Sequence, residues 1–317
     1  MSFTRTAVAT VLTLLPVNSA LALGSHPGTP EKACIAACAE TDFVEANGVR
    51  YAYRSFGVKG GVPLVFFQRF RGSMDEWDPS LIDAIARNRH VILFDNAGVA
   101  RSSGDASPRL TGWADSAAAF IAALGISEAD VLGFSFGGLV AQELALRHPK
   151  LVRRLIIAGS GAGYVEGANL SEAAVKIATK PLNVDEDFLF LFFRDTATSQ
   201  AAGRAHLARL KQRADAFAKL VSTPTWQAML SAGSDVGTVE TSFLKRSGAI
   251  HQPVLIANGV EDIMIPTYQS YALSQVIPNA RLIIYPDSGH GFLFQYGPEF
   301  GAEIVRFLNE PEAVPAN

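Results

Sequence analysis

Cysteine is scarce in this sequence, with only Cys34 and Cys38 among 317 residues. A disulfide-built scaffold needs several cysteine pairs, so the fold must depend on a hydrophobic core. Two cysteines four positions apart on a helix lie at a distance that a disulfide tolerates, and an oxidising compartment would favour that bond. The alternative is two small apolar residues on a short helix. A metal site here would need further ligands, and no nearby histidine pair supplies them.

Long runs of one charge are missing too. The chain has 27 Lys and Arg against 30 Asp and Glu, a net charge of −3. It has no basic cluster, acidic tail, low-complexity tract or internal repeat. These absences argue against a nucleic-acid partner and a repeat architecture. Apolar residues, in contrast, make up 49% of the chain, enough for one large core in a single domain.

The first 22 residues have the composition of an export signal. Arg5 gives a positive start, residues 7–17 form an apolar run, and Ala20-Leu21-Ala22 supplies the small residues that a signal peptidase recognises. The alternative is an uncleaved membrane anchor. The apolar run falls short of the roughly 20 residues needed to span a bilayer, and Pro16 interrupts it. We therefore predict a signal peptide over 1–22 and a secreted or periplasmic protein without stable membrane insertion.

After residue 40, apolar stretches of strand length alternate with stretches of helical spacing. Asn47-Gly48 predicts a hairpin turn within residues 41–57. The alternation after it is typical of a mostly parallel central sheet flanked by helices. The predicted strands are 62–67, 90–94, 129–134, 155–158, 253–257 and 281–285, and the predicted helices are 81–87, 111–124, 138–148, 171–180, 185–194, 199–220, 225–232, 239–245 and 298–308.

The alternation of strands and helices is interrupted between the fourth and fifth of these strands. Residues 161–248 have helical spacing throughout. An insertion at the carboxyl ends of parallel strands would form a lid over a binding site. We predict an α/β core over 41–160 and 249–310 and a helical cap over 161–248. An N-terminal segment at 23–40 and a tail at 311–317 complete the chain.

A nucleophile motif follows the third buried strand. Gly133-Phe134-Ser135-Phe136-Gly137 fits the pattern G-x-S-x-G and lies between a predicted strand and a predicted helix. A sharp turn in this context pushes the serine hydroxyl out of the sheet, where a base can activate it. The alternative is an ordinary serine that caps the helix. Ser135 is the candidate nucleophile.

The base must come from one of six histidines, and His290 is the best placed. It follows the last predicted strand, so it belongs to a loop at the carboxyl edge of the sheet, with Gly289 and Gly291 on either side. The alternative is a histidine in a surface turn. The other five lie near the signal, at the opposite strand edge, at a helix end or in the predicted cap: His26, His90, His148, His206 and His251.

An acid is needed to hold the tautomer of the base and to stabilise its charged form. Asp262 follows the predicted strand 253–257 and therefore also lies at the carboxyl edge. Glu261 and Asp287 are the rivals. The chain order Ser, Asp, His agrees with the order known for this nucleophile motif.

These motifs together resemble the α/β-hydrolase superfamily, over about Phe43 to Leu308. The resemblance implies an α/β-hydrolase fold and a cofactor-free acyl transfer through a covalent acyl-enzyme, with no metal. Residues 95–102 resemble the family's loop after the second parallel strand, which is usually structural. The matching catalytic segments are 133–138, 258–262 and 289–291.

One loop departs from the family pattern. The loop after the first parallel strand normally begins with His-Gly, whereas residues 68–73 here are Gln-Arg-Phe-Arg-Gly-Ser. By position, the backbone N–H groups of Phe70 and Phe136 would form the oxyanion hole, and backbone donors do not depend on side-chain identity. Arg69 or Arg71 could bind an anionic group of the substrate; the alternative is that both point to solvent.

The leading function is hydrolysis of an ester, lactone or related acyl bond in a small, partly apolar molecule. The aromatic stretch 188–193 would either pack the cap on the core or line a pocket. One alternative is an aminopeptidase of the proline-iminopeptidase type, with an acidic group from 185–187 binding the amine. The same triad could also hydrolyse a carbon–carbon bond or catalyse peroxidation. A non-catalytic ligand-binding protein is the contrasting class.

Overall fold

The computed structural model describes residues 35–311. The predicted signal peptide, Cys34 and residues 312–317 lie outside this range. Cys38 is disulfide-bonded. Between residues 35 and 311, none of the helices has the length and apolar character needed to cross a bilayer.

The centre of the fold is an eight-stranded sheet with the strand order β1-β2-β4-β3-β5-β6-β7-β8. The hairpin β1–β2 is antiparallel and joins β4 in an antiparallel pair, while every pair from β4 to β8 is parallel. The predicted α/β-hydrolase fold, with its mostly parallel sheet, is therefore confirmed. The strands are β1 (Asp42–Ala46), β2 (Val49–Gly57), β3 (Leu64–Phe67), β4 (His90–Phe94), β5 (Ala129–Phe134), β6 (Val152–Ala158), β7 (Val254–Gly259) and β8 (Ala280–Tyr285).

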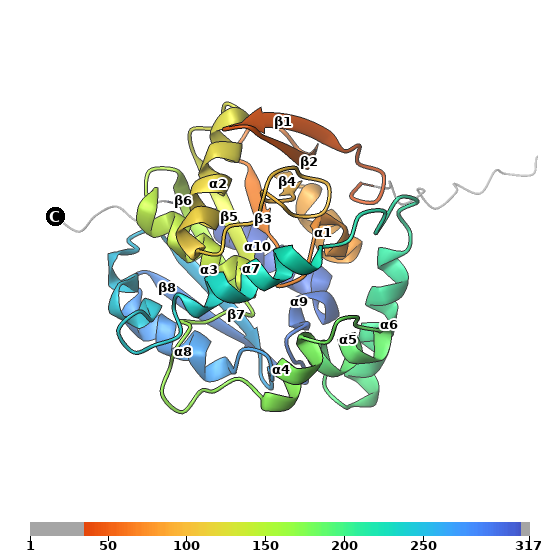
Figure 1. Cartoon of the computed structure of the whole chain (residues 1–317), viewed down its shortest axis with the longest axis vertical. Coiled ribbons are helices and arrows are strands. Elements are labelled where there is room, and N and C mark those ends of the chain that lie inside the picture. Colours follow the sequence, from red (N-terminus) through yellow and green to blue (C-terminus); the bar gives the residue numbers. More distant parts are fainter. Residues whose placement is uncertain (1–34, 312–317) are drawn as a thin grey trace, which may run out of the picture. The chain divides into compact units, whose positions relative to one another are not determined.

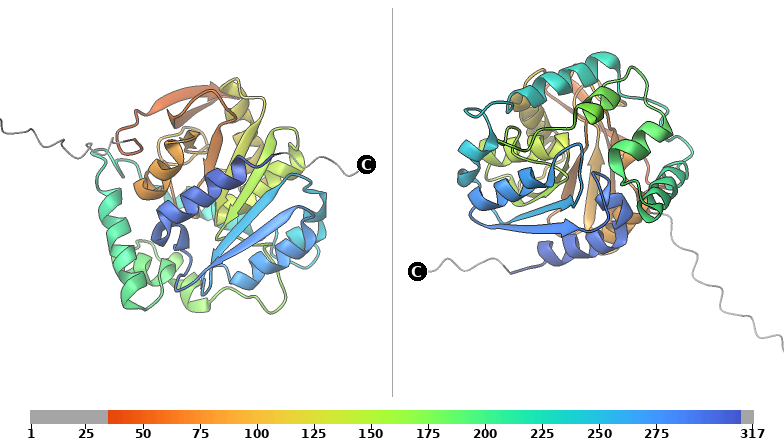
Figure 2. Two further views of the ribbon diagram at one scale, coloured as in Figure 1. Left: turned by 180° about the vertical axis from the view of Figure 1, so that it is seen from behind. Right: turned by 90° about the horizontal axis from the view of Figure 1, so that it is seen from below.

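Helices cover both faces of the sheet (Figures 1 and 2). On one face α2 (Leu110–Ala123), α3 (Phe136–Arg147) and α8 (Thr267–Val276) bury their apolar sides. On the other face α1 (Pro79–Ala86) packs against α10 (Gly297–Leu308), beside α9 (Phe292–Gln295). Strands buried on both faces explain the near-continuous apolar runs in the sequence. The helix α8 is absent from the helices predicted above.

The segment from 161 to 248, here called the insertion, joins β6 to β7. Its helices α4, α5 and α6 lie side by side, and α7 lies apart from them against α3 (Figure 1). The insertion also contains two short 3₁₀ turns, η2 and η3. The elements are α4 (Glu172–Ala178), α5 (Asp185–Phe192), α6 (Ala197–Leu210), α7 (Thr223–Ser234), η2 (Phe243–Lys245) and η3 (Ser247–Ala249).

Two predicted helices of the insertion are wrong in extent. The helix predicted over 199–220 ends at Leu210, because core side chains bind the backbone that follows. The Phe217 N–H donates to Asp75, and Phe217 has a φ of 61°, which no helix tolerates. The helix predicted over 239–245 is only the short turn η2, where the side chain of Ser242 accepts a bond from the Leu244 N–H.

A buried polar triplet attaches α6 to the core. Asp78 caps the N-terminus of α1 by accepting a bond from the Ser80 N–H at 2.8 Å. The same carboxylate accepts bonds from Arg209 at 2.7 and 2.8 Å and pairs with the Nδ1 of His206 at 2.8 Å. These bonds hold the pKa of Asp78 well below its ordinary range, against the desolvation that raises it. His206 is thus a structural link between the insertion and the core.

Candidate active site

Ser135 lies at a strained turn between β5 and α3. Its φ of 56° and ψ of −119° are rare for a residue with a side chain. The turn is held by the Ser135 N–H, which donates to the Ala158 carbonyl at 2.9 Å, and by the Gly138 N–H, which donates to the Ser135 carbonyl at 2.9 Å. Such strain is stored where function requires a side chain in one position.

The two glycines of the motif make room for this turn. A Cβ on Gly133 would collide with the carbonyl of Gly137, so the strand and the helix approach too closely for any side chain. A Cβ on Gly137 would collide with the carbonyl oxygens of Phe67 and Gln68. The loop after β3 therefore passes directly over the serine turn.

His290 and Asp262 come from the loops after β8 and β7, and the structure brings them together. The distance from His290 Nδ1 to Asp262 Oδ2 is 2.7 Å, and both side chains are buried. The other carboxylate oxygen of Asp262 accepts bonds from the Met264 and Ile265 N–H groups at 2.8 and 2.9 Å. Because the carboxylate only accepts, it favours the tautomer with the proton on Nδ1, which leaves a free lone pair on Nε2.

Aromatic rings hold the imidazole in place. The ring of His290 lies 4.9 Å from that of Phe134 and 5.1 Å from that of Phe192, between centroids. Its Nε2 is buried and has no hydrogen-bond partner among the described residues. Ser135 and His290 line the same cavity, which has a volume of about 370 Å³. Between residues 35 and 311, no hydrogen bond joins the two side chains, and the triad stays a prediction.

The two rival acids are engaged elsewhere. Glu261 pairs with Arg194 at 2.7 Å, and Asp287 pairs with Arg194 at 3.0 Å and accepts bonds from Thr196. Neither forms a bond to His290. The geometry therefore favours Asp262 over both rivals.

The side chain of Gln68 holds the loop after β3 in shape through two hydrogen bonds within that loop. Gln68 occupies the position at which the α/β-hydrolase pattern described above has histidine. Its side-chain oxygen accepts a bond from the Arg69 N–H, and its amide donates to the Ser73 carbonyl, both at 2.7 Å. The N–H groups of Phe70 and Phe136 donate to no acceptor in the described part of the chain. Two free donors on adjoining segments agree with the predicted oxyanion hole. The role of Gln68 had no signal in the sequence beyond the altered motif.

Arg69 and Arg71 both line the cavity, yet they have different surroundings. The guanidinium of Arg71 donates to the carbonyls of Ala178, Lys180 and Pro181 at 2.5 to 3.2 Å. It thereby ties the loop after β3 to the end of α4. The guanidinium of Arg69 forms one hydrogen bond to the described residues, from Nη1 to the Phe70 carbonyl at 2.9 Å.

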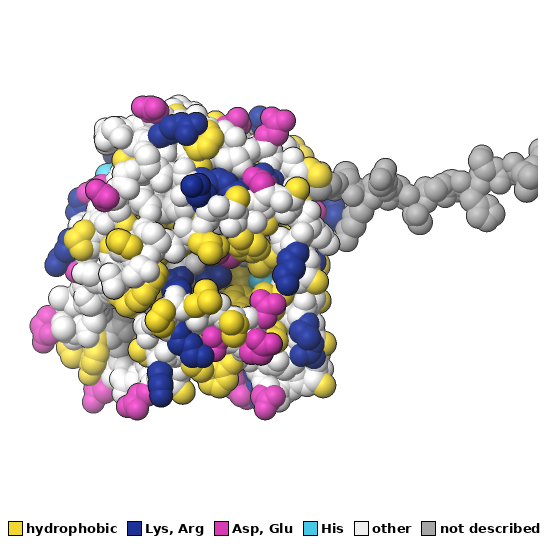
Figure 3. Space-filling view, turned by 45° about the vertical axis from the view of Figure 1, so that its right-hand side comes forward, with side chains coloured by type: hydrophobic (Ala, Val, Ile, Leu, Met, Phe, Trp, Pro, Cys, Tyr) yellow, Lys and Arg dark blue, Asp and Glu magenta, His cyan; other side chains and the backbone are white. Residues whose placement is uncertain are grey.

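The aromatic stretch of α5 divides between two tasks. Phe188, Leu191 and Phe192 line the cavity beside Ser135, while Phe193 is buried against the core. The acidic start of α5 is a helix-capping device, because Asp187 accepts a bond from the Val184 N–H at 3.2 Å and pairs with Lys180 at 2.6 Å. In Figure 3, hydrophobic side chains gather around a hollow beside basic and acidic ones.

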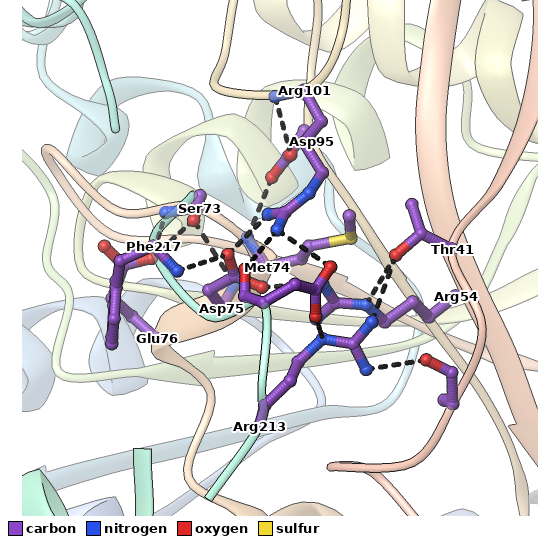
Figure 4. Close-up of polar contacts among 12 residues, drawn as sticks. Thr41, Arg54, Ser73, Met74, Asp75, Glu76, Asp95, Arg101, Arg213 and Phe217 are labelled. Atoms are coloured by element: carbon purple, nitrogen blue, oxygen red, sulfur yellow. Dashed lines mark hydrogen bonds and ion pairs between the residues drawn. The ribbon is translucent and has the colours of Figure 1, made fainter. Parts of the chain in front are cut away.

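A buried charge network around Asp75, which no sequence motif predicts, reaches the backbone of Phe217 (Figure 4). Asp75 pairs with Arg54 at 2.6 Å and with Arg101 at 2.5 Å, and it accepts the Phe217 N–H at 3.0 Å. Phe217 lines the cavity. Asp75 therefore sets the position of a cavity residue in the insertion.

Nearby, the carboxyl of Asp95 is fully enclosed. It accepts bonds from the Met74 N–H at 2.8 Å and the Arg101 N–H at 3.1 Å. Burial raises its pKa to about 7 despite these two bonds. Within the described range no group of three or more His, Cys, Asp or Glu side chains could hold a metal ion.

Comparisons with known proteins agree with this architecture. A family profile described as alpha/beta hydrolase fold matches residues 62–295. The chain is 30% identical to a 2-hydroxymuconate semialdehyde hydrolase of Pseudomonas putida over 72% of this chain and 80% of that protein. A second protein so named, from a Pseudomonas strain, is 27% identical over 84% and 93%. An alpha/beta hydrolase fold protein from Chitinophaga pinensis has 37% identity and a TM-score of 0.81, covering 87% of this chain and 99% of its own.

The chain therefore belongs to the α/β-hydrolase fold family. The two relatives compared by sequence are named as hydrolases, which supports a hydrolase here.

Proposed function

We propose that this protein is a serine hydrolase that cleaves an ester, lactone or related acyl bond of a small, partly apolar substrate. The observation that carries the proposal is the His290–Asp262 pair, in which the Nε2 of His290 has no partner among the described residues and His290 lines the same cavity as the strained Ser135. A base oriented by a buried acid beside a nucleophile turn is the arrangement that acyl transfer requires.

The reaction follows from this arrangement in two halves. The Ser135 hydroxyl attacks the substrate carbonyl while Nε2 of His290 takes its proton, and Asp262 stabilises the resulting imidazolium. The N–H groups of Phe70 and Phe136 donate to the oxyanion of the tetrahedral intermediate. His290 then gives the proton to the departing alcohol. Water attacks the acyl-serine in the same way, releasing the acid and restoring Ser135.

The substrate range follows from the cavity. Apolar side chains of the insertion, among them Phe188, Leu191 and Leu210, line it together with Ser135. We propose that the insertion acts as a cap that admits small molecules and excludes polymers. The aminopeptidase alternative has less support, because Asp187 already pairs with Lys180. A second candidate substrate is 2-hydroxymuconate semialdehyde, which the names of two relatives contain.

A substrate panel on wild type and Ser135→Ala tests the proposal. It comprises p-nitrophenyl esters of increasing chain length, aminoacyl p-nitroanilides and 2-hydroxymuconate semialdehyde. We expect ester turnover that Ser135→Ala removes while the variant keeps the melting temperature of wild type. Turnover of the anilides alone would favour the peptidase, and turnover of the semialdehyde alone would favour the second candidate. Tight ligand binding with no turnover on any substrate would favour a non-catalytic protein.

We further propose that the chain is exported and cleaved after Ala22, into the medium or the periplasm. The signal-like composition of residues 1–22 and the disulfide at Cys38 both support an oxidising compartment. N-terminal sequencing of the protein recovered from that compartment should begin at Leu23. Recovery of an intact Met1 terminus from the cytoplasm would contradict this proposal.

A further inference from the structure

The side chain of Arg69 is held beside the catalytic cavity by the core and by α5. Arg69 follows Gln68 in the loop that crosses the serine turn. It lines the cavity together with Ser135 and His290. The guanidinium carbon lies 5.2 Å from the ring centre of Phe192 and 5.5 Å from that of Phe188. These two rings, which belong to α5 of the insertion, hold the guanidinium of Arg69 in position.

The hydrogen-bonding capacity of Arg69 is almost unused. A guanidinium has five N–H donors, and the one bond that Arg69 makes to described residues runs from Nη1 to the Phe70 carbonyl. Its Nε is buried and has no partner among those residues. The ring faces attract the charge, but they do not accept hydrogen bonds as a carboxylate does. A partly buried cation whose enclosed Nε has no partner is stabilised by an anion that binds it.

Other charged groups at the cavity do not meet this need. Arg71 is occupied by three carbonyls, and Lys211 at the mouth lies 3.5 Å from Asp185. Glu76 is the acid that faces Arg69. Its Oε2 accepts two bonds from Ser73, at 2.6 and 2.7 Å, and it forms no ion pair with Arg69. Burial raises the pKa of Glu76, and the nearby Arg69 opposes that shift.

The mouth of the cavity has the opposite character. Leu182, Val184 and Leu220 line it and are 73%, 51% and 66% exposed. Exposed aliphatic side chains around an opening favour an apolar ligand. The site therefore combines one cationic position close to Ser135 with an apolar path to the surface.

We propose that Arg69 binds a carboxylate of the substrate, so that the preferred substrates are small acyl compounds with a free carboxylate and an apolar body. This proposal rests on the proposed hydrolase function and narrows its substrate class. The planar fork of arginine matches the two oxygens of a carboxylate. Arg69 is the specificity-determining residue, whereas the guanidinium of Arg71 joins the loop to the end of α4.

Matched ester pairs test this assignment. The mono-p-nitrophenyl esters of succinic, glutaric and adipic acid carry a free carboxylate at three spacings, and their methyl-capped counterparts carry none. Wild type should prefer the free acid of at least one pair in kcat/KM. Arg69→Met should lower kcat/KM for that acid by roughly 100-fold more than for its capped counterpart. Arg69→Lys, which keeps the charge without the fork, should fall between the two, and Ser135→Ala gives the uncatalysed background.

The result separates this inference from the function on which it rests. Ser135-dependent turnover of capped and free esters without any preference would overturn the inference and leave the hydrolase standing. So would an equal loss on both members of a pair in Arg69→Met. If Ser135→Ala matches wild type, the hydrolase proposal fails, and calorimetry with monomethyl and dimethyl glutarate decides the carboxylate site. Monomethyl glutarate, which has a free carboxylate, should then bind wild type more tightly than it binds Arg69→Met, and dimethyl glutarate should show no such difference. Equal affinity of monomethyl glutarate for wild type and Arg69→Met would overturn the inference.

Discussion

The Nδ1 of His290 lies 2.7 Å from the Oδ2 of Asp262, although 28 positions separate the two residues in the chain. Adjacent parallel strands end at the same edge of the sheet, so the loops after β7 and β8 meet there. The second oxygen of Asp262 is bound by two backbone N–H groups, which fixes the carboxylate independently of the histidine. The imidazole is therefore oriented before any substrate arrives.

Asp262→Asn should lower kcat by about 10⁴-fold with little change in fold, because an amide donor facing Nδ1 selects the wrong tautomer. Steady-state kinetics on the best ester measures the effect. Glu261→Gln is the matched control, because Glu261 is an exposed neighbour that pairs with Arg194, and it should keep nearly full activity. A larger loss in the control than in Asp262→Asn would reverse the choice of acid.

Gly137→Ala should abolish most activity and destabilise the protein, since the new Cβ collides with the carbonyls of Phe67 and Gln68 and displaces the loop that carries the Phe70 donor. Loss of one oxyanion donor alone costs about 100- to 1000-fold in rate. Gly233→Ala in α7 meets no atom within 4 Å and serves as the control. Kinetics and thermal melts on both variants check the prediction, which fails if Gly137→Ala turns over like wild type.

Local chemistry made much of this site predictable from the sequence. The turn at Ser135 is encoded by its two glycines, and the strands are encoded by apolar runs that only a sheet buried on both faces requires. His290 and Asp262 follow from their position after strands. The helix α8 was missed because its exposed Tyr268 and Tyr271 mask the helical pattern, although a parallel crossover between β7 and β8 calls for a helix.

Contacts between distant segments were not predictable. The sequence offers no reason to prefer Arg69 over Arg71 as an anion-binding residue. In the structure they differ because the guanidinium of Arg71 donates to carbonyls that follow α4. The end of α6 at Leu210 likewise depends on Asp75, about 140 positions earlier, which binds the Phe217 N–H. Tertiary hydrogen bonds overrode local helix propensity there.

Asp75→Asn should destabilise the fold by about 3–5 kcal/mol, because it leaves the buried Arg54 without its compensating charge. Urea denaturation gives the free energy of unfolding directly. Asp115→Asn removes an exposed pair with Arg147 and should cost less than about 1 kcal/mol. An equal loss in the free energy of unfolding in the two variants would mean that the buried network stabilises the fold no more than an exposed ion pair does.

The stability that Asp95 contributes should fall as pH rises from about 4 to about 7. Burial raises the pKa of Asp95 from 3.8 to about 7, so the folded state keeps a proton that the unfolded chain has already lost. The contribution is fully present below the ordinary pKa and is lost as pH passes the folded one, on the order of 4 kcal/mol in total. In Asp95→Asn, which cannot titrate, this part of the slope should vanish from denaturation curves measured between pH 4 and 8. An unchanged slope would assign the pH dependence to other groups.

The most direct test of the serine mechanism is covalent labelling by a fluorophosphonate, with the site located by mass spectrometry of the digested protein. We predict a single adduct, on the peptide that contains Ser135, and a much slower reaction in His290→Ala. An adduct on a different serine, or equal labelling of wild type and Ser135→Ala, would contradict the account.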